Sequence, residues 1–316
     1  MSDSEHHEAA NGGYSQQELF PIREVSRLTG VNPVTLRAWE RRYGLIQPTR
    51  TESGHRLYSP ADVAEVRAIL GWLERGVAVS KVGKLLARSQ TAKAEAPSEL
   101  PQGASEYAHW RDRLNAAVQA FDELTLTRLY GQVFATYPLA LAFEEIFMPI
   151  WEHSRLRQES FGITSEWAFL DHFLRGKVLK RLQFVQRETI DTHIVISAVP
   201  GQCHELELLV ATLLLSSERV WVQPLGMAQP LEELSLVCER IQPQALVLFS
   251  NHAPGADSAK RFMKLALHLD CPLLLAGEMS DMIQDQLVNS PVPCLGGDAR
   301  LMQRRLVQYI AGHLDT

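Results

Sequence analysis

Cysteine is scarce in this chain of 316 residues and is confined to its last third. The four cysteines are widely spaced and form no Cys-x-x-Cys pair; they are Cys203, Cys238, Cys271 and Cys294. Such spacing is typical neither of a zinc site nor of a disulfide framework. We therefore expect buried thiols in a reducing compartment.

Long apolar runs are also absent. No run approaches the roughly 18 residues that a transmembrane helix requires, and the N-terminal stretch MSDSEHHEAANGG lacks the apolar core of an export signal. These absences exclude an evident membrane span, so we expect a cytoplasmic protein with no membrane partner.

Positive charge is in deficit overall, because 31 Lys and Arg face 37 Asp and Glu and the formal net charge is -6. The deficit is unevenly spread. Residues 20–90 contain 12 basic and 6 acidic side chains, a charge of +6, so the rest of the chain carries -12. A basic module on an acidic body predicts a polyanionic partner for the module, most simply nucleic acid.

The composition divides the chain into five parts. A polar tail (1–18), expected to be disordered, precedes the basic module (19–88), and a linker with Pro, Gly and Ser (89–105) follows. Residues 106–188 repeat apolar side chains at three- and four-residue spacing, which predicts a bundle of about four helices.

In the last part, residues 189–316, the spacing of apolar residues changes. Five short apolar runs alternate there with helical segments, namely 193–199, 220–225, 245–250, 272–277 and 292–297. This alternation predicts a flavodoxin-like, five-stranded parallel sheet that is doubly wound. Ligands of such sheets bind beyond the carboxyl ends of the strands. The fold class is therefore multidomain, with an α module, a bundle and an α/β domain.

The basic module begins with signals for two helices around a tight turn. Apolar residues at every third position predict the inner face of a first helix, formed by Ile22, Val25 and Leu28. Gly30 supplies the turn. Asn32 followed by Pro33 is typical of the start of a second helix. Ser59-Pro60 marks the start of a third.

The second helix is predicted to pack through Val34, Leu36 and Trp39. Its outward turns carry side chains suited to the DNA major groove, namely Thr35, Arg37, Arg41 and Arg42. Two strands, 45–50 and 55–58, joined across Gly54, predict a hairpin wing beside the phosphate backbone. The candidate contacts there are Arg50, His55, Arg56 and Tyr58, and Tyr43 is a further candidate that is also suited to packing. A merely solvated helix face would not explain this order of elements.

The module resembles the winged helix-turn-helix of the MerR family of transcription regulators. The matching residues are Ile22, Val25, Thr35, Leu36, Arg37, Trp39, Glu40, Arg42, Gly44, Leu45, Arg50, Gly54, Arg56, Tyr58 and Asp62. The resemblance implies a dimer on a pseudo-palindromic, double-stranded operator whose DNA is distorted between half-sites, with RNA polymerase as a neighbour at the promoter. The thiol ligands of the MerR metal sensors have no counterpart here, because no cysteine precedes Cys203.

The order of winged helix, bundle and α/β domain resembles the cobalamin-dependent photoreceptor repressors of that family. The resemblance implies a cobalamin between bundle and sheet, with cobalt ligated by the His of a Gly-Glu-x-His-x-x-Gly motif after the first strand. Here VPGQCHELEL places Gly201 and His204 at matching positions and makes His204 the candidate cobalt ligand. Gln202 replaces the acid, however, and Glu207 replaces the last glycine.

Other cofactor positions are matched in part. The family's pocket for the nucleotide tail corresponds to residues at strand ends, namely Ser250, Gly277, Gly296 and Gly297. The photoreceptors also carry a Trp upstream of a Glu-His pair above the cofactor. Trp151 is present here, and Glu166-Trp167 is the candidate counterpart of the pair, with Trp in place of His. Alternatively, both tryptophans are bundle core and His204 is a histidine that caps a helix.

We therefore predict a DNA-binding transcription regulator without enzymatic activity and with no catalytic residues. Three hypotheses stay open for its C-terminal half: it binds cobalamin and responds to light, it binds another small ligand such as a nucleotide messenger, or it only sets the oligomeric state, dimer or tetramer. The alternative from another class is a cobalamin-carrying, methyltransferase-like module, which would leave the basic N-terminal part unexplained.

Overall fold

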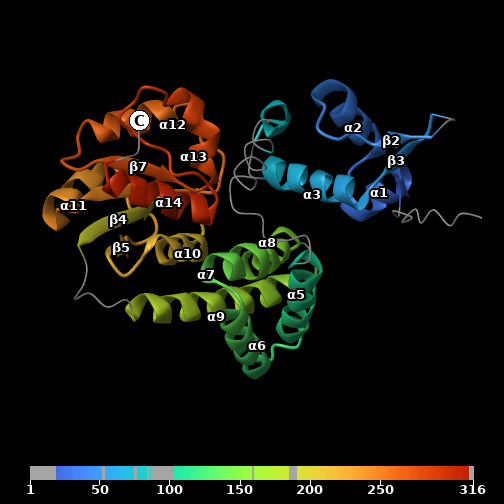
Figure 1. Ribbon diagram of the computed structural model, residues 1–316, viewed down its shortest axis with the longest axis horizontal. Coiled ribbons are helices and arrows are strands. Elements are labelled where there is room, and N and C mark those ends of the chain that lie inside the picture. Colours follow the sequence, from blue (N-terminus) through green and yellow to red (C-terminus); the bar gives the residue numbers. More distant parts are fainter. Residues whose placement is uncertain are drawn as a thin grey trace, which may run out of the picture. The chain divides into compact units, whose positions relative to one another are not determined.

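The computed structural model describes residues 19–51, 54–74, 77–83, 86, 103–158, 160–184 and 191–312. The chain forms two compact units, residues 1–86 and 87–316, whose helices and strands are labelled in Figure 1. The predicted tail and residues 89–102 of the predicted linker lie outside the described residues. No helix in the described part is both long and apolar enough to cross a membrane.

The first unit combines short helices with a small antiparallel sheet of strand order β1-β3-β2. The strands are β1 (Phe20–Pro21), β2 (Thr49–Arg50) and β3 (Arg56–Tyr58). The helices are α1 (Ile22–Thr29), α2 (Pro33–Ala38) and α3 (Pro60–Glu74), and a π-helical turn η1 (Trp39–Tyr43) prolongs α2. This is the predicted winged helix-turn-helix, with one strand, β1, that the sequence analysis did not predict.

Local side-chain chemistry sets these helix ends where the sequence predicts them. Gly30 ends α1 with a φ of 74°, a conformation that favours glycine. The Asn32 side chain accepts a hydrogen bond from the Val34 N–H at 2.8 Å and so caps α2. Ser59 and Asp62 cap α3 reciprocally, since the Ser59 N–H donates to Asp62 at 2.7 Å and the Asp62 N–H donates to Ser59 Oγ at 3.1 Å.

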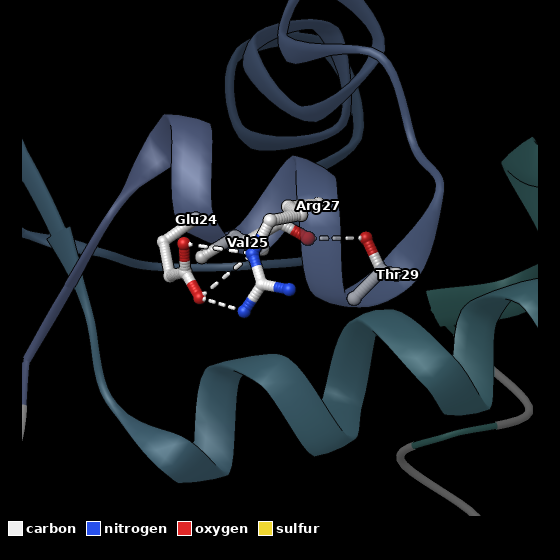
Figure 2. Close-up of polar contacts among 4 residues, drawn as sticks. All are labelled: Glu24, Val25, Arg27 and Thr29. Carbon is white, nitrogen blue, oxygen red and sulfur yellow. Dashed lines mark hydrogen bonds and ion pairs between the residues drawn. The ribbon is translucent and has the colours of Figure 1, made fainter.

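Figure 2 shows two side-chain interactions within α1. The Arg27 Nε lies 3.1 Å from both carboxylate oxygens of Glu24, one turn earlier on the helix. In the last turn the Thr29 hydroxyl donates to the Val25 carbonyl oxygen at 2.7 Å. The charge of Arg27 is thus already paired within α1.

In the second unit, residues 103–183 form the predicted bundle of four helical stretches. They are α5 (Gly103–Gln119), α6 (Glu123–Thr136), the continuous run α7 (Leu139–Leu141), η2 (Ala142–Phe147) and α8 (Met148–Leu156), and α9 (Ile163–Gln183). Buried aromatic side chains fill its core, with Phe143, Phe147 and Trp151 almost fully enclosed. The bundle shares this core with one face of the sheet that follows.

The sheet is parallel and has the strand order β5-β4-β6-β7. Its strands are β4 (Thr192–Ala198), β5 (Val220–Pro224), β6 (Ala245–Phe249) and β7 (Leu273–Ala276). Alternate residues of β4 enter different cores: Ile194 and Ile196 join the core shared with the bundle, and Val195 joins a second core. The sheet is therefore doubly wound, as the sequence predicts.

Helices cover both faces of this sheet. Helices α10 (Glu205–Leu215) and α14 (Ala299–Ile310) contribute to the core shared with the bundle. The second core takes residues from α11 (Leu234–Ile241), α12 (Ser258–Ala266) and α13 (Glu278–Ile283), and the 3-10 turns η4 (Leu231–Glu233) and η5 (Gln284–Gln286) flank these helices.

The prediction of a fifth strand at 292–297 is wrong, since the sheet has four strands among the described residues. The segment does run beside β7, where Leu275 and Cys294 form an isolated parallel bridge. The Leu275 N–H donates to the Pro293 carbonyl at 2.9 Å, and the Leu295 N–H donates to the Leu275 carbonyl at 2.7 Å. Pro293 has no N–H to donate, so the ladder does not extend into a strand.

Candidate functional site

The second helix of the first unit presents a row of exposed side chains. Arg37, Arg41 and Arg42 are exposed, and Thr35 is half-buried. The prediction that Val34 packs inward is wrong, because its side chain is 68% exposed. Leu36 and Trp39 occupy the buried side, and a residue two positions before Leu36 lies on the opposite side of a helix.

Val34, Arg37 and Arg41 share this outward side, since they are spaced by three and four residues. An exposed valine beside arginines can contact the methyl group of a thymine in the major groove, and arginine is suited to guanine. Sequence reasoning missed Val34, although its helical spacing from Arg37 was the signal that could have found it.

Glu40 ties the recognition segment to the wing. Its Oε1 accepts a hydrogen bond from Arg50 Nη2 of β2 at 2.7 Å, and its Oε2 accepts one from Arg56 Nε of β3 at 2.5 Å. Burial of Glu40 opposes its ionisation, but the hydrogen bonds from Arg56 and Arg50 keep its pKa below the ordinary value. The two predicted wing arginines are therefore oriented by one carboxylate, a role that the sequence analysis did not assign.

The remaining wing candidates separate into surface and core. His55 is exposed beside Gly54, whose φ of 81° closes the turn, and Tyr43 is 40% exposed at the end of η1. Tyr58 is fully buried, at 0% exposure, so the prediction of a DNA contact through its side chain is wrong. Tyr58 ends the central strand of the small sheet, and its ring lies in the core beneath the wing.

In the second unit, the rings of four side chains lie close together where the bundle adjoins the sheet. The sequence analysis gave three of them separate roles and gave the fourth, His252, none. Trp151 of α8 lies 5.4 Å from His204 between ring centroids, and Trp167 of α9 lies 6.2 Å from His204. His252, after β6, lies 6.3 Å from His204. We call these four residues the joint cluster. Burial lowers the pKa of His204, although Glu207 opposes the effect, so its imidazole is neutral at neutral pH.

A chain of charged groups holds Trp151 in the joint cluster. The Trp151 indole N–H donates to Asp171 Oδ1 at 2.9 Å, and Arg175 donates to Asp171 Oδ2 at 2.8 Å. Arg175 also donates to Glu205, in the first turn of α10, at 2.7 Å. These bonds link the bundle to the helix that His204 precedes, and they fix the indole orientation.

The Glu207 carboxylate is hydrogen-bonded to two of the loops at the carboxyl ends of the strands. Its Oε2 accepts from the His204 N–H at 2.8 Å, and its Oε1 accepts from the Asn251 side chain at 2.9 Å. Asn251 in turn accepts from the Glu278 N–H at 3.3 Å. Glu207 is only 8% exposed. Glu207, which occupies the position of the last glycine in the family motif, is therefore buried and connects three strand-end loops.

Ser250 and Gln202, two of the candidate cofactor residues, are hydrogen-bonded to each other. The Ser250 hydroxyl donates to the Gln202 carbonyl at 2.6 Å and accepts from the His252 N–H at 3.0 Å. The hydroxyl thus closes the loop after β4 onto the loop after β6. Among the described residues, the Gln202 side-chain oxygen and the Trp167 indole N–H are buried without a hydrogen-bond partner.

Three of the four candidate glycines, Gly277, Gly296 and Gly297, permit close packing of the same loops. Gly277, at a φ of 83°, would place a Cβ 2.4 Å from the Ser250 carbonyl oxygen. Its N–H donates to the Gly296 carbonyl at 3.0 Å, and a Cβ on Gly297 would lie 3.1 Å from the Glu278 backbone nitrogen. Backbone contact between loops accounts for these glycines. Gly201, at a φ of 71°, turns the loop before His204.

Glu166 stays at the periphery of this arrangement. It lies half-buried in the first turn of α9, and a Cβ on Gly162 would lie 3.9 Å from its Oε1. The structure therefore brings together Trp151, Trp167 and His204, and His252 joins this group to Gln202 and Ser250. In the described part of the chain, no group of three or more His, Cys, Asp or Glu side chains is arranged to hold a metal ion.

Comparison with known proteins finds a family match for the first unit and relatives over most of the chain. Residues 20–89 match the family described as MerR HTH family regulatory protein. The HTH-type transcriptional repressor CarH of Myxococcus xanthus is 31% identical over 271 residues, which cover 83% of this chain and 89% of that protein. The HTH-type transcriptional regulator MlrA of Escherichia coli K12 is 56% identical over 68 residues, 22% of this chain and 28% of the relative.

One solved structure is similar over part of the chain. The monomethylamine corrinoid protein of Methanosarcina barkeri shares 11% identity, with a TM-score of 0.45 over 64% of this chain and 99% of that chain.

Proposed function

The chain belongs to the MerR-type transcription regulators related to the CarH and CarA repressors, and we propose that its first unit binds double-stranded operator DNA through the exposed side of α2 and η1 and through the wing. The observation that carries this proposal is the exposed row of Val34, Arg37 and Arg41 on a capped helix. Such a helix fits the major groove, and its arginines and valine can contact base edges.

The proposed contacts are exposed side chains together with Thr35 and Arg56, which are half-buried. Side chains of the recognition segment enter the groove, namely Val34, Thr35, Arg37, Arg41 and Arg42. Side chains at its end and in the wing contact the phosphate backbone, namely Tyr43, Arg50, His55 and Arg56. Electrophoretic mobility shifts with the protein's own promoter region test the proposal. Specific retardation at moderate salt is expected, and affinity no higher than for random DNA would reject it.

We expect Glu40→Gln to lower operator affinity about 5-fold, although it makes the protein more positive. The substitution weakens the bonds that orient Arg50 and Arg56, and loss of a charge-assisted hydrogen bond costs about 1 kcal/mol or more. Fluorescence anisotropy would measure the ratio of operator to random-DNA affinity.

Glu24→Gln is the matched control for this experiment. It removes the same charge from the same unit, but its carboxylate binds Arg27 on α1 and leaves the wing intact (Figure 2). An equal fall in the affinity ratio for both variants would mean that the loss does not depend on the bonds that orient the wing.

For the second unit, which has a cobalamin-binding-like domain, we propose regulation without a His-ligated cobalamin. His204 contacts Trp151 and Trp167 at centroid distances typical of direct ring contact, so no flat macrocycle fits between these rings as they lie. The Glu207 carboxylate is buried and bonded where the motif requires a glycine. The residues present therefore do not fit the group in the arrangement that the family resemblance implies.

Cobalamin binding is the second candidate, because His204, Ser250 and Gly277 keep their positions at the strand ends. Mixing the protein with adenosylcobalamin in the dark, followed by desalting, separates the two. We expect a protein without visible absorption. Retained colour that is lost in His204→Ala would instead establish a His-ligated cobalamin, and with it a route to light sensing.

We further propose that the protein acts as a homo-oligomer, at least a dimer, near RNA polymerase at a promoter, and that it has no enzymatic activity. A two-fold protein matches a pseudo-palindromic operator, because each recognition helix then reads one half-site. The relatives described above are transcription regulators. The methyltransferase-like alternative has no supporting observation in the described residues.

A further inference from the structure

Val34 is an apolar side chain on a surface of charged ones. It is 68% exposed, more than any other large apolar side chain in the described part of the first unit. A single exposed apolar side chain is common on protein surfaces and by itself indicates no partner. Its position indicates a partner here, because the exposed Arg37 and Arg41 follow it at about one and two turns on the same side of the helix.

The place of Val34 in α2 suits a contact with a base edge. Its backbone N–H donates to the Asn32 side chain at 2.8 Å, which fixes Val34 in the capped first turn of the helix. A β-branched side chain in a helix has one strongly preferred rotamer, so a contact orders it at little cost in entropy. Recognition helices contact base edges with residues near their N-terminus. Val34 therefore lies where a helix-turn-helix protein reads bases.

The polar groups of the recognition segment, residues 33–43, limit which bases it can read. Adenine is read by Asn or Gln, and cytosine by Glu or Asp. The segment contains no Asn, Gln or Asp, and the side chain of the preceding Asn32 is engaged in the helix cap. Its single acid, Glu40, accepts hydrogen bonds from Arg50 and Arg56 of the wing. The exposed side chains of the segment therefore favour guanine, which arginine reads, and thymine, whose methyl group an apolar side chain contacts.

Given the proposed binding of operator DNA by the first unit, on which this inference rests, we propose that Val34 determines specificity by contacting the C5-methyl group of a thymine. Arg37 reads a guanine in the neighbouring base pair. Three residues of an α-helix rise about 4.5 Å along its axis, and neighbouring base pairs are about 3.4 Å apart. The two side chains therefore reach adjacent base pairs, and each half-site of the operator contains a thymine next to a guanine.

The test replaces thymine by uracil, which differs from thymine only by that methyl group. The promoter fragment that the full-length protein retards is prepared with either base, and random-sequence DNA prepared in the same two ways corrects for general changes in the duplex. We expect uracil to lower the ratio of operator to random-DNA affinity about 4-fold for each half-site, because burial of one methyl group contributes about this factor. Fluorescence anisotropy would measure the ratio.

Val34→Ala separates the methyl contact from other effects of uracil. We expect the variant to bind the thymine operator more weakly by a similar factor and to bind the thymine and uracil operators equally well. Alanine has a higher helix propensity than valine, so the substitution preserves α2. Arg27→Ala is the matched control, because Arg27 is exposed on α1 and paired with Glu24 (Figure 2), and it should keep the full sensitivity to uracil.

Replacement of single thymines by uracil then locates the contact, and we expect one sensitive thymine in each half-site, with a guanine in the adjacent base pair. Three results would overturn the proposal: equal binding of both operators by the unaltered protein, an undiminished effect of uracil in Val34→Ala, or a sensitive thymine without a neighbouring guanine. All three are measured on DNA that the protein binds specifically. They therefore differ from failure of the proposed function, in which no promoter fragment is preferred over random DNA.

Discussion

Arg37→Ala combined with Arg41→Ala is expected to lower operator affinity about 100-fold or more. Both side chains lie on the exposed side of the recognition segment, and each arginine contact to a base or phosphate contributes about 1 to 3 kcal/mol. Two such contacts correspond to about 2 to 6 kcal/mol, or roughly 1.5 to 4 powers of ten in the dissociation constant. Titration of labelled promoter DNA by fluorescence anisotropy at several salt concentrations would measure the loss.

The salt dependence distinguishes the kinds of contact. If both arginines bind phosphates, the slope of log affinity against log salt should fall by about 2 and random DNA should be affected equally. If they bind base edges, discrimination between operator and random DNA should fall instead. The control is Arg27→Ala with Arg67→Ala, two exposed arginines of the same unit on α1 and α3. An equal loss in the control would mean that net charge alone governs binding.

The elements of the DNA-binding unit could be predicted because their signals are local. Asn32 caps a helix two residues later, and Ser59 pairs with Asp62 within one turn, so short sequence windows contain both partners. The incorrect predictions concern the direction in which a side chain points, which the local pattern does not specify. Val34 has the composition of a core residue, but its position relative to Leu36 turns it outward. Tyr58 lies beside basic wing residues in the sequence, yet its side chain is buried, and Arg56, which shares its face of β3, is itself only half-exposed.

The contents of the second unit's site were predicted less well, because its partners are distant in the sequence. Trp151 and Asp171 are 20 positions apart, and Glu207 and Asn251 are 44 apart. Comparison with the family motif identified Glu207 only as a missing glycine. Its spacing of three residues from His204 is that of a capping box and could have indicated the bond to the His204 N–H. No local pattern could have indicated Asn251.

Glu144 of the bundle contacts the start of α14, which is another pairing of residues that lie far apart in the sequence. Glu144, in η2 of the bundle, accepts a hydrogen bond at 2.6 Å from the N–H of Ala299, 155 positions away. Asp298 caps the same helix by accepting from the Leu301 N–H at 2.9 Å. Two carboxyl groups thus share one helix start. Burial, the charge of Asp298 and that of Glu145 raise the pKa of Glu144 to about 7, while the Ala299 N–H and Arg300 oppose the rise.

The sign of the pH dependence follows from this shift. Below the ordinary pKa of 4.5, Glu144 is protonated in the folded and the unfolded chain, and the carboxyl imposes no ionisation penalty. As pH rises from 4.5 towards 7, the unfolded chain ionises more readily, so the free energy of unfolding falls. Above pH 7 the loss is complete, and the shift corresponds to about 2 to 3 kcal/mol after allowance for partial exposure.

Glu144→Gln is therefore expected to stabilise the second unit by about 2 kcal/mol at pH 8 and to change its stability little near pH 4.5. Glutamine keeps an oxygen that can accept from the Ala299 N–H, but it does not ionise beside Asp298. Urea unfolding followed by tryptophan fluorescence at both pH values would measure the difference, because Trp151 and Trp167 belong to this unit. Glu239→Gln, at an exposed position of α11, is the control for loss of one charge. A variant that is destabilised at pH 8 would show instead that the ionised carboxylate, favoured by the start of α14, holds the bundle to the sheet.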